Sequence, residues 1–201
     1  MKKVIFVWVS ISLIQVVVAS CNIFCPCGCG NGKDQRINIL SWTIDTINDK
    51  YDRVDPATSY PYKEVSKRLS IGDRQIVQSV MYNNGNLMTT AYACQPAPIE
   101  ANQSFSSIQI VSTIETSYAD SNDLISVGQD ITDRFLVTDV FYSNFRPIKS
   151  FIDGLIIYDT DQYLIRLGQK PSQSTTLIFD IIITLSDGSI FELEDQLLTV
   201  M

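Results

Sequence analysis

Apolar and polar residues alternate with a period of two along much of the chain. The alternation is clearest in 37–47, 65–71, 105–115 and 162–168. Successive side chains of a β-strand point to opposite faces, so this pattern predicts half-buried strands. Segment 75–82 fits a strand as well as a helical turn, and we interpret it as a strand.

The clearest element is a hairpin close to the C-terminus, turning at Ser186-Asp187-Gly188. A two-residue loop would place Ile183 opposite Glu192 and so mix core with solvent. A three-residue loop with Gly188 in the left-handed conformation pairs Ile183 with Phe191 instead. We therefore predict the three-residue loop. Its apolar face is formed by Leu177, Phe179, Ile181, Ile183 and Leu185 on the first strand.

Two short helices are predicted between the strands. Asp130 can cap 131–135, and Pro147 suits the first position of a helix over 148–152. Segments rich in Asn, Asp, Pro, Gly and Ser are expected to be long loops: 48–62 and 83–103. Many short strands with few helices indicate an all-β, mainly antiparallel fold. We expect an immunoglobulin-like β-sandwich with one or two short helices.

The N-terminus carries the features of an export signal. Lys2 and Lys3 precede an apolar run over 4–18, and small residues precede Cys21. The run is too short and too polar for a membrane span. Val18-Ala19-Ser20-Cys21 resembles the bacterial lipobox, which implies a lipidated Cys21; an ordinary cleaved signal is the alternative. We expect a signal peptide over 1–20, a tether over 21–35 and one sandwich domain over 36–201.

Charge and composition exclude or disfavour several classes of function. The net charge of −7 becomes −9 when Lys2 and Lys3 leave with the signal peptide, which disfavours binding to nucleic acid. The chain contains no histidine. This excludes Ser-His-Asp and Cys-His catalysis and the zinc sites that use histidine.

Four cysteines remain beside Cys21: Cys25, Cys27, Cys29 and Cys94. Thiols outside the cytoplasm tend to pair, so a disulfide from Cys94 to one of the other three is expected. A zinc site with four cysteine ligands is the alternative. The C-x-C-x-C spacing lacks the usual two-residue gaps for it. We expect no metal and no cofactor.

The Tyr92-Ala93-Cys94-Gln95-Pro96-Ala97-Pro98 stretch and the Leu185-Ser186-Asp187-Gly188 turn, together with the lipobox and the Cys-rich tail, resemble a family of Bacteroidota lipoproteins with an uncharacterised domain. The resemblance implies a lipid-anchored protein of the cell envelope, at the outer membrane in either leaflet, and brings no activity. In that phylum Asp-Thr followed by an aliphatic residue can direct O-glycosylation. Asp45-Thr46-Ile47 fits, although we interpret Thr46 as an outward-facing strand residue.

Several acidic residues are candidates for a metal site or a catalytic site. Asp159 and Asp161, and the group Asp120, Asn122 and Asp123, could bind calcium but are more typical of turns. Asp180 opposite Glu194, or with Glu192, could form the carboxylate pair of a glycosidase, although nothing in the pattern forms a cleft around them. Aromatic residues in loops could form a binding patch: Tyr51, Tyr60, Tyr62, Phe141, Tyr142 and Phe145. Of these, we interpret Phe141 and Phe145 as core residues.

The sequence therefore predicts a membrane-anchored envelope lipoprotein that is a binding or structural accessory module and not an enzyme. Its expected partners are the membrane, through the lipid, and a protein or glycan ligand. One alternative is a carboxylate-based, glycosidase-like hydrolase on the same scaffold. Another is a surface-fibre subunit with an exposed strand edge or a displaceable terminal strand at 196–200.

Overall fold

The computed structural model describes residues 36–77, 98–118, 123–140 and 144–201. Arg36–Val77 and Ile99–Met201 form one compact unit. The other unit, Met1–Gln35 with Gln78–Pro98, lies almost entirely outside the described residues. The predicted domain bounds of 36–201 stay a prediction.

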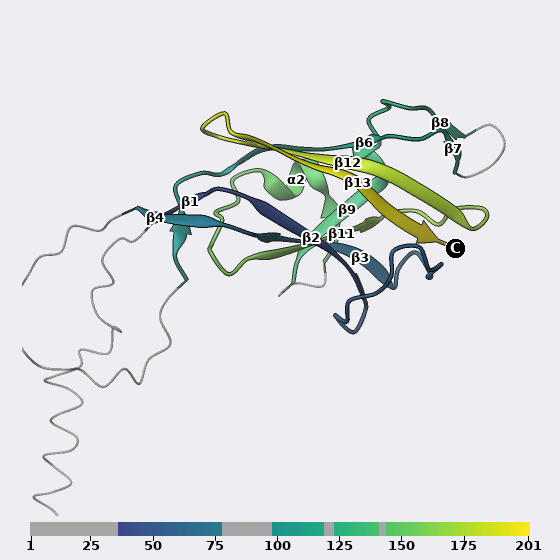
Figure 1. Ribbon diagram of the computed structural model, residues 1–201, viewed down its shortest axis with the longest axis horizontal. Coiled ribbons are helices and arrows are strands. Elements are labelled where there is room, and N and C mark those ends of the chain that lie inside the picture. Colours follow the sequence, from purple (N-terminus) through teal and green to yellow (C-terminus); the bar gives the residue numbers. More distant parts are fainter. Residues whose placement is uncertain (1–35, 78–97, 119–122, 141–143) are drawn as a thin grey trace, which may run out of the picture. The chain divides into compact units, whose positions relative to one another are not determined.

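Two antiparallel sheets form the body of the described unit (Figure 1). The first has the strand order β10-β9-β11-β3-β2 and the second the order β13-β12-β6. The strands are β2 (Trp42–Asn48), β3 (Val65–Ile71), β6 (Phe105–Ser112), β9 (Phe135–Asp139), β10 (Arg146–Pro147), β11 (Gln162–Leu167), β12 (Thr175–Leu185) and β13 (Ile190–Val200). The prediction of an all-β, antiparallel fold is confirmed.

The order of the longer strands is that of an immunoglobulin domain. When β2, β3, β6, β9, β11, β12 and β13 are lettered A to G along the chain, the sheets read A-B-E-D and C-F-G. This is the arrangement of constant-type immunoglobulin domains. The immunoglobulin-like sandwich predicted from short alternating strands is therefore present, with β10 added beyond strand D.

Smaller elements surround the sandwich. A third sheet has the order β4-β1-β5, and β7 pairs with β8. These elements are β1 (Arg36–Ile39), β4 (Arg74–Val77), β5 (Glu100–Ala101), β7 (Thr116–Ser117), β8 (Leu124–Ile125), the 3-10 helix η1 (Thr132–Arg134) and α2 (Ile148–Ile152). Within the described residues, no helix has the length and apolar character needed to cross a bilayer.

The core lies between the two sheets. Phe135 on β9 and Phe179 on β12 meet there, with ring centroids 5.2 Å apart, and both are fully buried. A second aromatic group comprises Trp42, Phe105 and Tyr163; Phe105 lies 5.4 Å from each of the other two rings. The inward-facing residues of the alternating segments therefore meet across the sandwich, as the period of two requires.

The predicted strand over 37–47 is interrupted. Leu40, two residues before the buried Trp42, is 54% exposed although the alternation over 37–47 would place both on one face. The backbone N–H groups of Leu40 and Ser41 both donate to the carbonyl of Asp73, which bends the chain between β1 and β2. The first half then pairs with β4 and β5, and the second half with β3. The expectation of one continuous strand is wrong because two different partners divide it.

The register of the C-terminal hairpin is confirmed. Ile183 pairs with Phe191, and the loop has three residues with Gly188 at φ +87°. The predicted Asp180–Glu194 pair is replaced by a β-bulge, because the register shifts between Phe179 and Ile181. The N–H of Asp195, whose φ is +53°, donates to Asp180 Oδ1 at 2.8 Å. Without the bulge, the carboxylates of Asp180 and Glu194 would lie directly opposite each other. With it, the Asp180 carboxylate accepts a backbone hydrogen bond instead.

The two helix predictions have different outcomes. The helix predicted after Pro147 is present as α2. Asp130 Oδ1 accepts the N–H of Thr132 at 2.9 Å, as expected of a cap, but the helix is only η1. The predicted bounds of 131–135 are wrong because Phe135 already begins β9. Pairing with β11 buries Phe135 and Val137, which a helix continuing from η1 could not do.

The sandwich has two distinct ends. Arg36 pairs with Val77 on one side and Glu100 on the other, so the chain enters and leaves the described unit at one end. We call this the tether end, because the segment 21–35 precedes it. The loop 49–64 and the β7–β8 pair lie at the opposite end, which we call the distal end (Figure 1, right).

Candidate functional site

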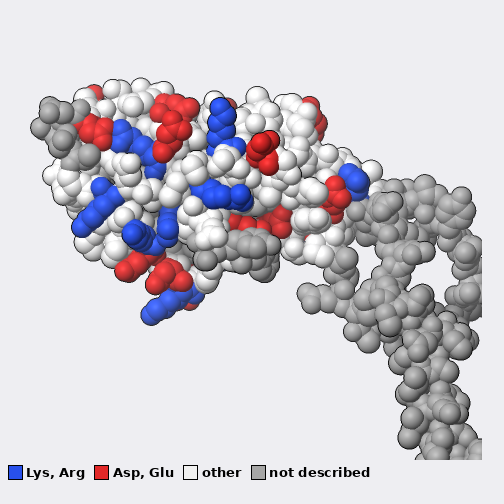
Figure 2. Space-filling view, turned by 180° about the vertical axis from the view of Figure 1, so that it is seen from behind, with Lys and Arg blue, Asp and Glu red and all other residues white. Residues whose placement is uncertain are grey.

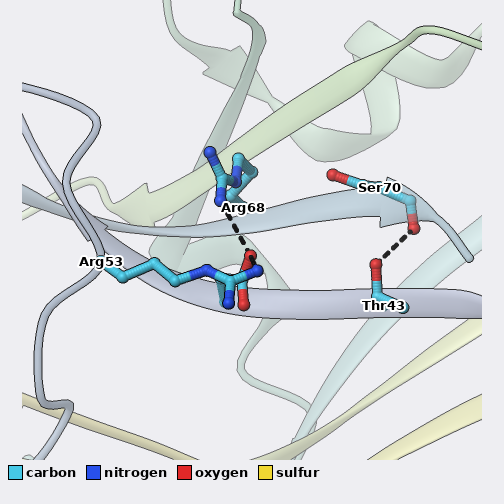
Figure 3. Close-up of polar contacts among 5 residues, drawn as sticks. Thr43, Arg53, Arg68 and Ser70 are labelled. Carbon is cyan, nitrogen blue, oxygen red and sulfur yellow. Dashed lines mark hydrogen bonds and ion pairs between the residues drawn. The ribbon is translucent and has the colours of Figure 1, made fainter.

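Three charged side chains meet on the outer face of β2 and β3. Asp45 and Arg68 lie opposite each other in the strand register. Arg68 Nη2 donates to Asp45 Oδ2 at 2.8 Å, and Arg53, from the loop after β2, reaches the same oxygen at 3.0 Å (Figure 3). We call these three residues the guanidinium cluster.

The guanidinium cluster has a net charge of +1 because one carboxylate is shared by two arginines. The hydrogen bond from Arg68, helped by the positive charges of both arginines, holds the pKa of Asp45 below its usual value, although burial opposes this. An ionised carboxylate held in two ion pairs is a poor general acid. Each guanidinium has five N–H donors, so donors remain for an external anion. The arrangement is suited to binding rather than to catalysis.

Polar groups extend this face on both sides of the cluster. Thr43 Oγ1 donates to the carbonyl of Ser70 at 3.3 Å (Figure 3). Arg166 on β11 lies over the ring of Phe145, with its Cζ 3.5 Å from the ring centroid, and donates to the carbonyl of Lys63 at 3.3 Å. The contact with Phe145 places that ring on the outer surface of the sandwich, so the interpretation of Phe145 as a core residue is wrong.

Replacing Asp45 with asparagine tests the energetic role of the cluster. Asp45→Asn is expected to lower the free energy of unfolding by about 1 kcal/mol at pH 7, because two guanidiniums would lose their shared anion. The folded-state pKa of Asp45 is depressed, so its contribution is present above the unfolded pKa and is lost as the pH falls through the folded pKa. Urea unfolding between pH 2 and 7 should show the difference between parent and variant closing in acid. A difference that is constant over this range would contradict the assignment.

Behind this face, on the core side of the same strands, lies a buried lysine. Lys67 is 3% exposed, and its Nζ donates to Thr46 Oγ1 at 2.9 Å. Burial lowers the pKa of Lys67 to about 8, although the charge of Asp45 acts against this. The interpretation of Thr46 as outward-facing is wrong, since Thr46 is 7% exposed. The period of two places it on the same face as Trp42 and Ile44, and a hydroxyl so covered is a poor acceptor for a glycan.

The acidic loop before β11 is occupied by hydrogen bonds of its own. Asp159 Oδ1 accepts the N–H of Ile99 at 2.9 Å, and its other oxygen pairs with Arg74 at 3.0 Å. Asp161 accepts the N–H of Tyr158 and the hydroxyl of Tyr163, at 2.7 and 2.9 Å. Burial raises the pKa of Asp161. These carboxylates hold the turn and the end of β11 together.

The second acidic group is only partly described. Asp123 forms a two-pronged ion pair with Arg134, with oxygen–nitrogen distances of 2.6 and 2.9 Å. Asp120 and Asn122 lie outside the described residues. Among the residues that are described, no three His, Cys, Asp or Glu side chains are grouped as metal ligands.

The candidates for a catalytic carboxylate pair lie on the outer surface of β12 and β13. They are Asp180, Glu192 and Glu194. Glu192 and Glu194 are exposed on β13, and Asp180 is half-buried on β12. Glu192 lies opposite Ile182. Their positions in the strands direct the three side chains away from the core, to the outer side of the described sheet.

A shallow cavity of about 260 Å³ lies at the tether end. It is lined by Arg36, by segment 100–104 and by segment 154–157. Its two charged residues, Arg36 and Glu100, form an ion pair at 3.4 Å with both side chains well exposed. One paired carboxylate in an open depression does not provide an acid and a base.

The loop tyrosines have different environments. Tyr51 is half exposed at the distal end, whereas Tyr60 and Tyr62 pack against the core. Phe141 and Tyr142 lie outside the described residues, as do all the cysteines. Tyr60 also forms backbone hydrogen bonds with Thr199 and Met201, covering the end of β13.

Sequence analysis missed the guanidinium cluster. The pairing of Asp45 with Arg68 follows once β2 and β3 are aligned, because both belong to the polar faces of alternating strands. Arg53 could not be placed, because it reaches Asp45 from a loop whose path is fixed by the side chain of Asn48, which accepts the N–H groups of Lys50 and Asp52.

No protein-family model and no curated protein sequence matches this chain. Among solved structures it is similar to the C-terminal domain of the antigen I/II polypeptide BspA of Streptococcus agalactiae, with 9% identity and a TM-score of 0.28. It is also similar to the C-terminal domain of the antigen I/II-family protein AspA of Streptococcus pyogenes, with 13% identity and a TM-score of 0.28. In each case 80% of this chain is covered and less than half of the other (49% and 46%). The strand order of the two sheets, rather than these similarities, identifies the fold.

Proposed function

We propose that this protein is a lipid-anchored protein of the cell envelope whose immunoglobulin-like sandwich is a binding or structural accessory module. The observation that carries the proposal is the separation of the two ends. Arg36, the first described residue, lies at one end of the described unit, whereas the loop 49–64 and the β7–β8 pair lie at the other end. A lipid on Cys21 would therefore attach the module through the end at which Arg36 lies.

The polar chemistry of the described residues favours binding over hydrolysis. The acidic residues of β12 and β13 lie on an open face, and Asp45 is held ionised by two arginines. A glycosidase needs two carboxyl groups facing a sugar across a cleft. We therefore rank the carboxylate hydrolase below the module.

The surface also fits a protein or glycan partner better than nucleic acid. Figure 2 shows Lys and Arg side chains as separate groups with Asp and Glu between them, not as a continuous basic stripe. A strand-exchanging fibre subunit is less well supported, because Leu198 and Val200 are buried and Tyr60 covers the end of β13. The protein is proposed to act at the outer membrane, in either leaflet.

Replacing the lipid acceptor tests the anchor. In a bacterium that processes lipoproteins, the parent chain is expected to take up labelled palmitate and to sediment with membranes, since several acyl chains hold a protein stably. Cys21→Ser should lose the label and become soluble. Cys29→Ser is the matched control and should keep both properties. A parent chain that takes up no palmitate would sink the proposal.

The soluble Cys21→Ser chain also tests the module itself. Incubation with a panel of neutral and acidic polysaccharides should yield at most retention of the intact polymer. Release of reducing ends, measured over time, would instead establish the hydrolase.

A further inference from the structure

The outer face of the sheet β13-β12-β6 is acidic. Its three strands contain no lysine or arginine. Asp180 and Glu192 point outward from β12 and β13, and the bulge adds Glu194 and Asp195, both exposed. We call this surface the acidic face.

The acidic face also carries aliphatic side chains. Val111, Ile178, Ile182 and Leu197 are half-buried, and Ile190 is 61% exposed. Val111, Ile178 and Ile182 lie on the side of the sheet away from the core, because their neighbours on each strand are buried. Leu197 and Ile190 share this side because they pair with the outward-facing Ile178 and Thr184. A solvated face of an antiparallel sheet is normally polar. Aliphatic residues ringed by charge are instead typical of a protein–protein contact.

The outer face of the other sheet has the opposite charge. Arg68 and Arg166 point outward from adjacent strands, and Arg53 joins them, whereas Asp45 is the carboxylate on this part of the surface. We call this surface the basic face.

We propose that the acidic face of one copy of this protein docks on the basic face of a second copy. The mature chain is acidic overall, but at physiological salt charges beyond about 8 Å are screened, so the charges inside the contact decide its sign. Glu192 and the bulge carboxylates would then approach Arg53 and the free donors of Arg68, and the aliphatic residues would be covered.

The contact joins two different surfaces on opposite sides of the sandwich, so it can repeat from copy to copy and build a row. The two faces lie on opposite sides of the sandwich, whereas the tether leaves from one end. A row would therefore run parallel to the membrane, and the tether end of every copy could remain next to the membrane. The orientation of the row rests on the proposed lipid anchor, although the contact itself does not.

Photocrosslinking of the full chain in cells tests the contact. Gln109 is exposed and lies beside Ile182 on the acidic face, so p-benzoylphenylalanine at Gln109 should yield a crosslinked dimer. Mass spectrometry should map the acceptor to β2, β3 or the Arg53 loop. The same probe at Ser150, exposed on α2, is the matched control and should not form this dimer.

A charge exchange makes the test specific. The Arg53 side chain is 76% exposed, so Arg53→Glu should keep the fold, as a thermal melt can verify. This variant should lower the crosslinked fraction about tenfold, and adding Glu192→Arg should restore it, since like charges across a contact are repulsive. No dimer, a dimer mapped elsewhere, or a failure of the exchange to restore it would each overturn the proposal.

Sedimentation of the soluble Cys21→Ser chain separates the two proposals. Association that strengthens with concentration and weakens with salt would support the contact even if palmitate labelling of the parent had failed. A monomer at all concentrations would overturn the contact and leave the anchor untouched.

Discussion

Replacing Lys67 with methionine is expected to raise the free energy of unfolding by about 3 kcal/mol at pH 7. Lys67 is 3% exposed, and its pKa is lowered to about 8 from 10.5 by burial. Each unit of such a shift corresponds to about 1.4 kcal/mol of unfavourable free energy for the charged form. Methionine fills a similar volume without the charge. The companion change Thr46→Val removes the hydroxyl that would otherwise lose its donor.

The free energy of unfolding of the parent should also depend on pH, through the titration of Lys67. Below pH 8 both states of the parent carry the proton on Lys67, and the full penalty is present. Between about pH 8 and 10.5 the unfolded chain binds this proton and the folded chain does not, so parent stability should rise with pH. The variant should lack this rise. Denaturant unfolding from pH 7 to 10.5 measures both, with Lys50→Met, at an exposed loop position, as control. Two results would contradict the prediction that the buried charge of Lys67 destabilises the fold. One is a variant less stable than the parent, and the other is a variant whose free energy of unfolding rises with pH as the parent's does.

Two neighbouring isoleucines provide the second large effect. Ile181 is fully buried between the sheets, whereas Ile182, the next residue, points outward and is half-buried. Ile181→Ala is expected to cost about 2–5 kcal/mol, because the cavity it leaves is walled by both sheets. Ile182→Ala should cost about 1 kcal/mol or less, since solvent can fill the space.

The comparison isolates the strand register, because the two variants share their chemistry, strand and neighbours in sequence. Urea unfolding of the two proteins under one condition measures the difference. Equal losses, or a larger loss at Ile182, would mean that β12 presents its other face to the core. In the crosslinking experiment the ranking should be reversed, with Ile182→Ala weakening the dimer.

The sequence was sufficient where the governing interactions are local. The register of the β12–β13 hairpin follows from the alternation of β12 and from a glycine at the left-handed turn position. The strand class of β3, β6 and β11 follows from the same period of two. Since an antiparallel sandwich is the stable way to bury many half-apolar strands, the fold class could be inferred as well.

The remainder depends on contacts between distant segments. The bend at Leu40 exists because Asp73, over thirty residues away, accepts two N–H groups there. β9 was missed because its pairing with β11 decides its conformation, whereas Asp130 and Asp133 suggested a helix locally. The burial of Lys67 contradicts the general preference of lysine for solvent, and nothing near it in the sequence indicates the cost.

The basic face illustrates the same limit at the level of the site. Strand alternation places Asp45 and Arg68 outward, and their pairing needs the relative register of β2 and β3. Arg53 enters from a loop, and Arg166 is flanked by an aromatic ring from another loop. A site assembled from three strands and two loops is fixed by tertiary packing, which composition and periodicity do not encode directly.

The bulge in β13 bears on how such a protein survives crowding. An edge strand with unpaired N–H and C=O groups can template aggregation with its neighbours. Over Ile190–Leu197, β13 has no second strand partner among the described residues, and in its middle the bulge carries two adjacent carboxylates with Asp195 in the left-handed conformation. A charged kink of this kind prevents another β-edge from zipping onto it. Molecules present at high local concentration are therefore protected at this edge against fusing into amyloid-like sheets.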